Sequence, residues 1–154
     1  MELILDAEGI NISFEIKGYK KEKNSDNPIW CKCSSSFVSD SWLNYSIKNS
    51  EALTCDEVEY LLENLQKLLN GQLKEDLEIE FIEPDFSFEL ITEKDLREDD
   101  RYDYIAKGYE IVDIKVYWCV HFWDDGALTD NYLKICLDRE EIVKLRDYLK
   151  NIVG

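Results

Sequence analysis

Apolar and polar residues alternate along several short segments of the chain. Successive side chains of a β-strand point to opposite faces of its sheet, so this alternation predicts strands that bury one face. Glu83-Pro84-Asp85 stands between two of these segments and predicts a turn, because proline presets φ for it. The segments with the alternating pattern are Ile10–Lys17, Leu43–Ile47, Leu77–Phe81, Phe86–Leu90 and Leu133–Leu137.

The segment Ile111–Trp123 is the strongest predicted strand, and it differs from the others because both of its faces are apolar. One face carries Ile114, Val116, Trp118, Val120 and Phe122, and the other carries Tyr117, Cys119, His121 and Trp123. Such a strand is typically central and covered on both sides. We therefore expect Trp118 to be almost fully buried. Asp124-Asp125-Gly126 predicts a hairpin turn into the strand that ends at Leu137.

Two segments show the three- and four-residue spacing of apolar residues that is typical of helices. The first, Glu57–Asn70, follows Thr54-Cys-Asp-Glu57, which has the spacing of a capping box, and it precedes Gly71, a residue that commonly ends a helix. The second, Arg139–Ile152, follows Asp138 with Glu141 three residues further on. We predict a helix at each place.

The order of elements is several strands, a helix, further strands and a final helix. Because strictly alternating βαβ units are absent, the expected fold class is α+β, with a mainly antiparallel β-sheet system of about 7–8 strands. A chain of 154 residues fits a single domain, 1–154. Two polar segments, Lys20–Asn27 and Thr92–Asp103, are predicted loops.

The balance of charge narrows the choice of partners. Thirty-four acidic and eighteen basic residues give a formal net charge of −16 at pH 7. Such a field repels phosphate backbones and anionic lipids, and it attracts basic surfaces. We therefore expect no direct binding of nucleic acid or membrane. The alternative interpretation is that the charge serves solubility alone.

The five cysteines indicate a reducing compartment. Their number is odd, and the sequence opens M-E-L-I-L-D without the features of an export signal. No segment approaches the roughly 20 consecutive apolar residues of a membrane span, so the cytoplasm is the expected location. Cys31 and Cys33 form a C-x-C pair without a second pair at zinc-finger spacing. We expect no bound metal and no cofactor.

Catalytic residues are hard to find in this sequence. The single histidine, His121, and Cys119 share one face of the long predicted strand, and a thiolate beside an imidazole is a known nucleophilic arrangement. Tyr117 and Trp123 share that face, however, so packing is the favoured interpretation. Carboxylate pairs such as Glu80 with Glu83 or Glu89 carry little information in so acidic a chain. We predict that the protein is not an enzyme.

The charged loop is the most distinctive candidate for binding a partner. Carboxylates there are interleaved with tyrosines, and such a composition suits a basic partner, because tyrosines contribute contact area and carboxylates steer the encounter. The alternative is a solvated loop without a partner. The candidate partner-binding residues are Glu93, Asp95, Glu98, Asp99, Asp100, Tyr102, Asp103 and Tyr104.

Two stretches of the sequence resemble the WapI-like immunity proteins, small acidic cytoplasmic proteins of bacteria that carry contact-dependent polymorphic toxins. These are L-T-C-D-E-V-E-Y-L-L-E-N-L-Q-K-L-L-N-G (Leu53–Gly71) and I-E-F-I-E-P-D-F-S-F-E-L (Ile79–Leu90). The predicted order of elements is similar over nearly the whole chain. The segments Cys31–Ser39 and Arg97–Asp103 depart from the family pattern.

The resemblance implies a protein that neutralises a cognate toxin domain by binding it, and it carries over no catalytic residues. Many toxin domains that attack nucleic acid are cationic, so the expected partner is basic. The oligomeric state is left open by the sequence. The alternatives are an acidic interaction module or subunit with no link to toxins and, less favoured, an enzyme that uses Cys119 and His121 or a carboxylate pair.

Overall fold

The structure is a computed structural model that describes residues 1–22 and 26–154. The described residues form two helices and ten strands in antiparallel sheets, which confirms the predicted α+β class with a somewhat larger number of strands than the expected 7–8. The middle of the predicted loop Lys20–Asn27, residues 23–25, lies outside the described residues.

The first half of the chain forms a four-stranded antiparallel sheet, here called sheet A. Its strands follow in chain order as β1 (Leu3–Ala7), β2 (Ile10–Lys17), β3 (Trp30–Ser39) and β4 (Leu43–Thr54). The alternation in β3 is hard to recognise in the sequence, because small residues such as Cys33 and Ser35 occupy inward positions.

The second four-stranded sheet, sheet B, has the order β10-β9-β6-β5 and is also antiparallel. The predicted turn at Glu83-Pro84-Asp85 joins β5 to β6, and Asp125-Gly126 joins β9 to β10 with both residues at positive φ, 51° and 75°. Two such residues are typical of tight hairpins. The bounds are Leu77–Glu80 for β5, Phe86–Ile91 for β6, Lys115–Asp124 for β9 and Ala127–Leu137 for β10.

Both predicted helices are confirmed, as α1 (Cys55–Leu69) and α2 (Arg139–Val153). Thr54 and Glu57 form the expected capping box: Thr54 Oγ1 accepts from the backbone N–H of Glu57 at 3.1 Å, and Glu57 Oε1 accepts from that of Thr54 at 2.9 Å. Asp138 likewise accepts from the backbone N–H of Glu141 at 3.1 Å. Neither helix, within the described residues, is long and apolar enough to cross a membrane.

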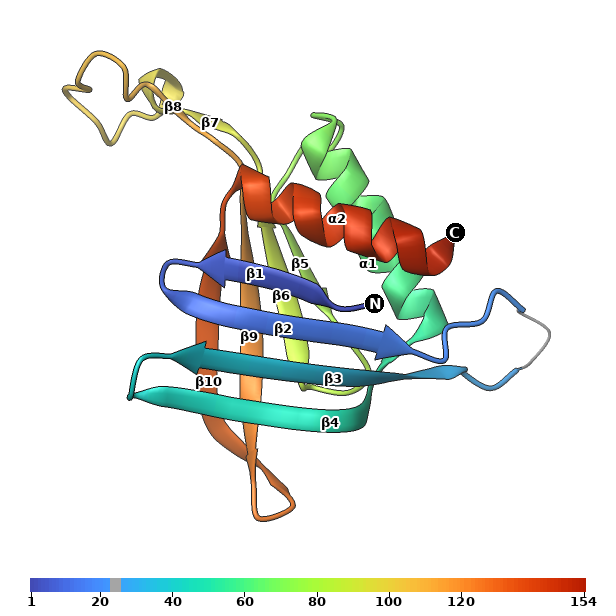
Figure 1. Cartoon of the computed structure of the whole chain (residues 1–154). Coiled ribbons are helices and arrows are strands. Elements are labelled where there is room, and N and C mark those ends of the chain that lie inside the picture. Colours follow the sequence, from blue (N-terminus) through green and yellow to red (C-terminus); the bar gives the residue numbers. More distant parts are fainter. Residues whose placement is uncertain (23–25) are drawn as a thin grey trace.

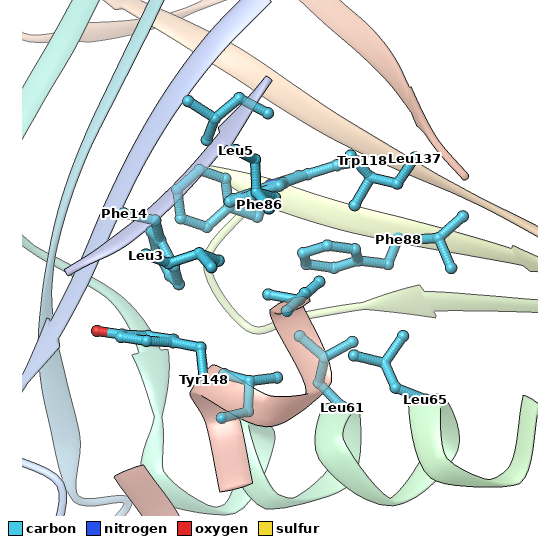
Figure 2. Close-up of a cluster of buried hydrophobic side chains, with 14 of the residues drawn as sticks. Leu3, Leu5, Phe14, Leu61, Leu65, Phe86, Phe88, Trp118, Leu137 and Tyr148 are labelled. Carbon is cyan, nitrogen blue, oxygen red and sulfur yellow. The ribbon is translucent and has the colours of Figure 1, made fainter. Parts of the chain in front are cut away.

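Sheet A lies across sheet B, α2 runs alongside β1, the edge strand of sheet A, and α1 packs against α2 (Figure 1). Side chains from all of these elements meet in one buried cluster, where Leu3 and Phe14 of sheet A face Trp118 of β9 and Leu61 of α1 (Figure 2). Trp118 is fully buried, as predicted, and the rings of Phe14, Phe37 and Phe86 stand nearly perpendicular to it at 5.2–5.6 Å between centroids. Aromatic rings attract one another in this edge-to-face arrangement.

The long strand differs from its prediction in two ways. Its central place in sheet B is confirmed, but it is covered on one face only: Val116, Trp118 and Val120 are buried, whereas Tyr117 and His121 on the opposite face keep part of their surface exposed. The strand is also shorter than Ile111–Trp123, because Asp113 and Ile114 interrupt it and Ile111–Val112 forms a separate strand, β8.

Residues 92–113 form an arm that projects from the body at the end of sheet B (Figure 1). The outgoing strand β7 (Lys94–Asp95) pairs with β8 (Ile111–Val112), and a 3₁₀ turn, Leu96–Glu98, follows β7. The predicted loop Thr92–Asp103 is therefore the first part of a longer excursion with a two-stranded stem.

Candidate functional site

The arm is held at its base by side-chain bonds where the chain leaves the body and where it returns. On the outgoing side, Asp76 Oδ1 accepts from the Thr92 backbone N–H at 2.9 Å and from Lys94 Nζ at 2.6 Å. Burial alone would raise the pKa of Asp76, but the bonds from Lys94 and Thr92 outweigh it and lower the pKa. On the returning side, Arg139 donates to both carboxylate oxygens of Asp113, at 2.7 and 3.0 Å. Two elements of the body, the segment before β5 and α2, therefore brace the arm.

Two of the predicted binding carboxylates have partners within the arm itself. Asp95 accepts two bonds from the guanidinium of Arg97, at 2.8 and 2.9 Å, and Asp99 is paired with Arg101 at 2.6 Å. The guanidinium of Arg97 lowers the pKa of Asp95, and that of Arg101 lowers the pKa of Asp99 to about 2. These two carboxylates are thus neutralised locally and contribute little to the field of the arm.

The other predicted residues of the arm face solvent. Glu93, Glu98, Asp100 and Asp103 are exposed, and none of them forms an ion pair with another described residue of the chain. The rings of Tyr102 and Tyr104 are 48% and 82% exposed. The structure therefore brings the acidic and aromatic residues of the prediction together on one projecting element.

The arm also carries exposed apolar residues that the sequence interpretation did not include. Tyr109 is 73% exposed and Ile111 is 47% exposed, on the returning side of the arm. The glycine at position 108, which has a positive φ of 94°, marks the non-periodic segment that contains Tyr109. That break in the pattern was the available signal for a longer arm.

A second solvent-facing surface lies on sheet B, on the side away from sheet A and the helices. We call it the outer face. In the register of the sheet, Tyr132 stands opposite His121, Lys134 opposite Cys119, and Cys136 opposite Tyr117. Side chains of β6 extend these rows. The outer face comprises Ser87, Glu89 and Ile91 of β6, Lys115, Tyr117, Cys119 and His121 of β9, and Tyr132, Lys134 and Cys136 of β10.

The side chains of the outer face contact one another across the strands. Lys134 Nζ lies 4.4 Å from the centroid of the Tyr117 ring and 3.2 Å from Glu89 Oε2. The first contact is a cation–π interaction, and the second is an exposed ion pair. The rings of His121 and Tyr132 are 5.3 Å apart. The surface is thus an ordered array of aromatic, thiol and charged groups.

The arm and the outer face meet in a groove of about 960 Å³. Ile91 and Tyr117 form its wall on sheet B, while Val112, Leu96 and Tyr102 belong to the arm. Carboxylates of the arm border the same groove, among them Glu98 and Asp100. Part of the arm, including Tyr102, and one side of the outer face, Ile91 and Tyr117, therefore belong to one concave surface.

A buried carboxylate at one corner of the sheets has a structural role. Asp85 is 5% exposed, and its Oδ2 accepts from Trp123 Nε1 at 3.0 Å and from Ser50 Oγ at 3.4 Å. Nearby, the hydroxyl oxygen of Tyr45 accepts from the Trp123 backbone N–H at 3.1 Å. These bonds fasten β4 of sheet A to the end of β9.

The structure places the other chemical candidates in packed positions. Cys119 and His121 share the outer face, as predicted, but in the described part of the chain no hydrogen bond joins them. Cys31 and Cys33 are buried in the core, where Cys31 Sγ lies 3.5 Å from Cys55 Sγ. Burial raises the pKa of Cys33 to about 12, which keeps this thiol protonated.

Metal binding has no support from the geometry. Residues 1–22 and 26–154 contain no group of three or more histidine, cysteine, aspartate or glutamate side chains that could hold a metal ion. The expectation that the purified protein holds no zinc stays a prediction, which elemental analysis of the protein would test.

The fold and the exposed surfaces define an acidic α+β protein whose distinctive features lie on its surface, on the arm and the outer face. Comparison with known proteins gives this class a name. The model of the immunity protein WapI-like family matches residues 3–154, essentially the whole chain, and the chain belongs to that family. No curated protein matches it.

Proposed function

We propose that this chain is a cytoplasmic protein that neutralises a cognate bacterial toxin domain by forming a stoichiometric complex with it. Membership of an immunity family supports the link to a toxin. We further propose that residues 1–154 act as one immunity-like domain, because the buried cluster is continuous between both sheets and both helices. In this proposal the chain has no catalytic role, needs no cofactor and binds neither nucleic acid nor membrane.

The observation that carries the proposal is the braced arm. Its base is fixed to the body through Asp76 and Asp113, so its exposed side chains are presented at a defined place. Binding of a partner to Tyr102 and Tyr104 costs the arm less conformational entropy than it would cost an unattached loop, because part of the ordering is already present. These are the residues that the sequence pattern predicts for binding.

The charge of the protein supports a basic partner. The formal net charge is −16, and the carboxylates of Glu98, Asp100 and Asp103 are exposed and form no ion pair within the described part of the chain. Opposite charge accelerates encounter more than it strengthens the final complex. A cationic toxin domain would therefore be drawn to the arm and held there by less polar contacts, across an interface of roughly 1,600 Å² if it has the usual size.

The test is a complex between purified partners. The C-terminal domain of a secreted protein encoded beside this gene, in an inactivated form, should co-elute with the chain at a 1:1 ratio. In cells, the active domain should arrest growth, and co-expression of this chain should restore it. An unrelated toxin domain is the control.

The contrary result is equally clear. Failure to bind the neighbouring domain with a Kd below about 1 μM, together with continued growth arrest, would contradict neutralisation. It would favour an acidic interaction module without a toxin partner.

A further inference from the structure

We propose that the outer face of sheet B is the main contact surface for the toxin domain, with Tyr117 and Tyr132 as anchors and the arm as its acidic rim. This inference rests on the proposed function and assigns the contact to residues of β9 and β10 in addition to the arm. Three observations carry it: the composition of the face, its continuity with the arm, and its charge.

The composition is unusual for a solvated sheet face. In an antiparallel sheet with one wet side, polar residues are expected to alternate with buried apolar ones. Here the outward positions of β9 carry Tyr117, Cys119 and His121 after a single lysine, Lys115, and Tyr132 stands beside them, 58% exposed. Tyrosine is enriched at the centres of protein interfaces, since its ring gives a large contact area and its hydroxyl tolerates water.

The groove makes this face continuous with the arm. Ile91 and Tyr117 of the sheet and Tyr102 of the arm line the same concavity. A partner seated between them would contact both surfaces at once. The fixed base of the arm places Tyr102 at the side of the face, where it can grip a convex segment of the partner.

The distribution of charge around the outer face favours a basic partner. Glu78 and Glu80 point outward on the edge strand β5, and Glu98 and Asp100 border the groove on the arm. On the face itself, Lys134 is paired with Glu89 at the centre, and Lys115 stands at the end of β9 opposite Ile91. A second copy of this chain, with its own net charge of −16, would be repelled by this rim. A toxin domain with lysine or arginine around an apolar centre fits it.

Binding kinetics test the role of the anchors. Tyr117→Ala combined with Tyr132→Ala should raise the dissociation rate from the inactivated toxin domain, and with it Kd, by roughly tenfold or more. Tyr60→Ala is the matched control, because Tyr60 is also about half exposed, at 48%, but lies on α1. Its Kd should stay within about twofold of wild type. Equal Kd values for the double variant and wild type would overturn the inference and leave the proposed function intact.

Thiol footprinting tests the same surface in the wild-type protein and therefore does not depend on the folding of a variant. Cys119 and Cys136 are partly exposed on the outer face, whereas Cys31, Cys33 and Cys55 are buried. A maleimide should label the first two in the free protein, and the toxin domain should slow that labelling by roughly tenfold or more. The three core thiols are the internal control.

The footprint also separates the two proposals. Labelling of Cys119 and Cys136 at an unchanged rate in a complex that forms would place the interface elsewhere and overturn the inference alone. Failure of wild-type protein to form a complex would contradict the proposed function, and this inference would fall with it.

Discussion

The two faces of β9 carry similar types of residue, but one face is buried in the core and the other faces solvent. Trp118 on the inner face is fully buried among phenylalanine rings, while Tyr117 beside it contacts the cation of Lys134 and solvent. The inner face is enclosed because sheet A and the helices cover it, and nothing in the described chain covers the outer face. An apolar residue in a strand therefore shows that its position is compatible with burial. Whether the position is buried depends on which other elements of the fold pack against that face of the sheet.

The largest expected effect comes from the inner face. Trp118→Ala removes the centre of the buried cluster and leaves a cavity, so it should lower the free energy of unfolding by about 3–5 kcal/mol. Urea denaturation measures the loss. Tyr117→Ala is the comparison on the outer face and should cost less than about 1 kcal/mol. Similar losses for both variants would mean that the two faces do not differ in their contribution to stability.

A smaller effect is expected from the arm. Reversing Glu98, Asp100 and Asp103 to lysine should slow association with the inactivated toxin domain by roughly tenfold at low salt, because these carboxylates steer a cationic partner. The difference should shrink at physiological ionic strength, where charges are screened over about 8 Å. Stopped-flow measurements at several salt concentrations test both points.

The matched control for the arm changes the net charge by the same amount elsewhere. Reversal of Glu2, Glu51 and Glu63, which are exposed on or beside sheet A and α1, should slow association less than reversal on the arm. Equal slowing by the two triple variants would show that total charge matters and that the position of the carboxylates does not.

The smallest effect concerns pH. Burial, followed by a hydrogen bond with Asp138, raises the pKa of Glu141 from 4.5 to about 7. The folded state then binds this proton more tightly than the unfolded state, so the contribution of Glu141 is complete below pH 4.5 and is lost as the pH rises through about 7. The pKa of Asp138 is lowered by its bonds to Glu141, so its own contribution is lost only on acidification, below 3.8.

The expected outcome is a difference in how steeply the free energy of unfolding changes with pH. Between about pH 5 and pH 7.5, the free energy of unfolding should fall with rising pH more steeply for wild type than for Glu141→Gln. Glu140→Gln removes a neighbouring carboxylate of the same turn and is the control. Parallel curves for Glu141→Gln and wild type would contradict a raised pKa at Glu141.

Local patterns predicted much of this fold. Thr54 with Glu57 and Asp138 with Glu141 marked the two helix starts, because capping depends on residues only three positions apart. The hairpin at Asp125-Gly126 was equally local. In contrast, β3 was missed, since its inward positions hold small residues such as Cys33 and Ser35, which suit close packing but resemble a loop. The prediction that both faces of β9 are covered was wrong, because burial of a sheet face depends on elements that are distant in sequence.

The sequence predicted which types of residue make up the candidate site, but it did not predict how they are arranged in space. The sequence indicated that acidic residues and tyrosines cluster after Ile91, and the structure places them on the arm. The pairing of Asp95 with Arg97 and of Asp99 with Arg101 follows the spacing D-x-R, which is visible in the sequence. The groove that joins Tyr102 to Tyr117 could not, because it depends on how the arm leaves the sheet.

The hydroxyl of Tyr148 has a consequence for how the protein is made. It accepts from the Ile16 backbone N–H at 2.9 Å and donates to the Met1 carbonyl at 3.2 Å, so α2 fastens the first two strands. A ribosome delivers Tyr148 more than a hundred residues after Ile16, and until then the inner side of β1 and β2 lacks this helix. Long-range contacts of this kind slow folding and lengthen the exposure of apolar surface in the nascent chain. We therefore expect the growing polypeptide to depend on chaperones until α2 has emerged.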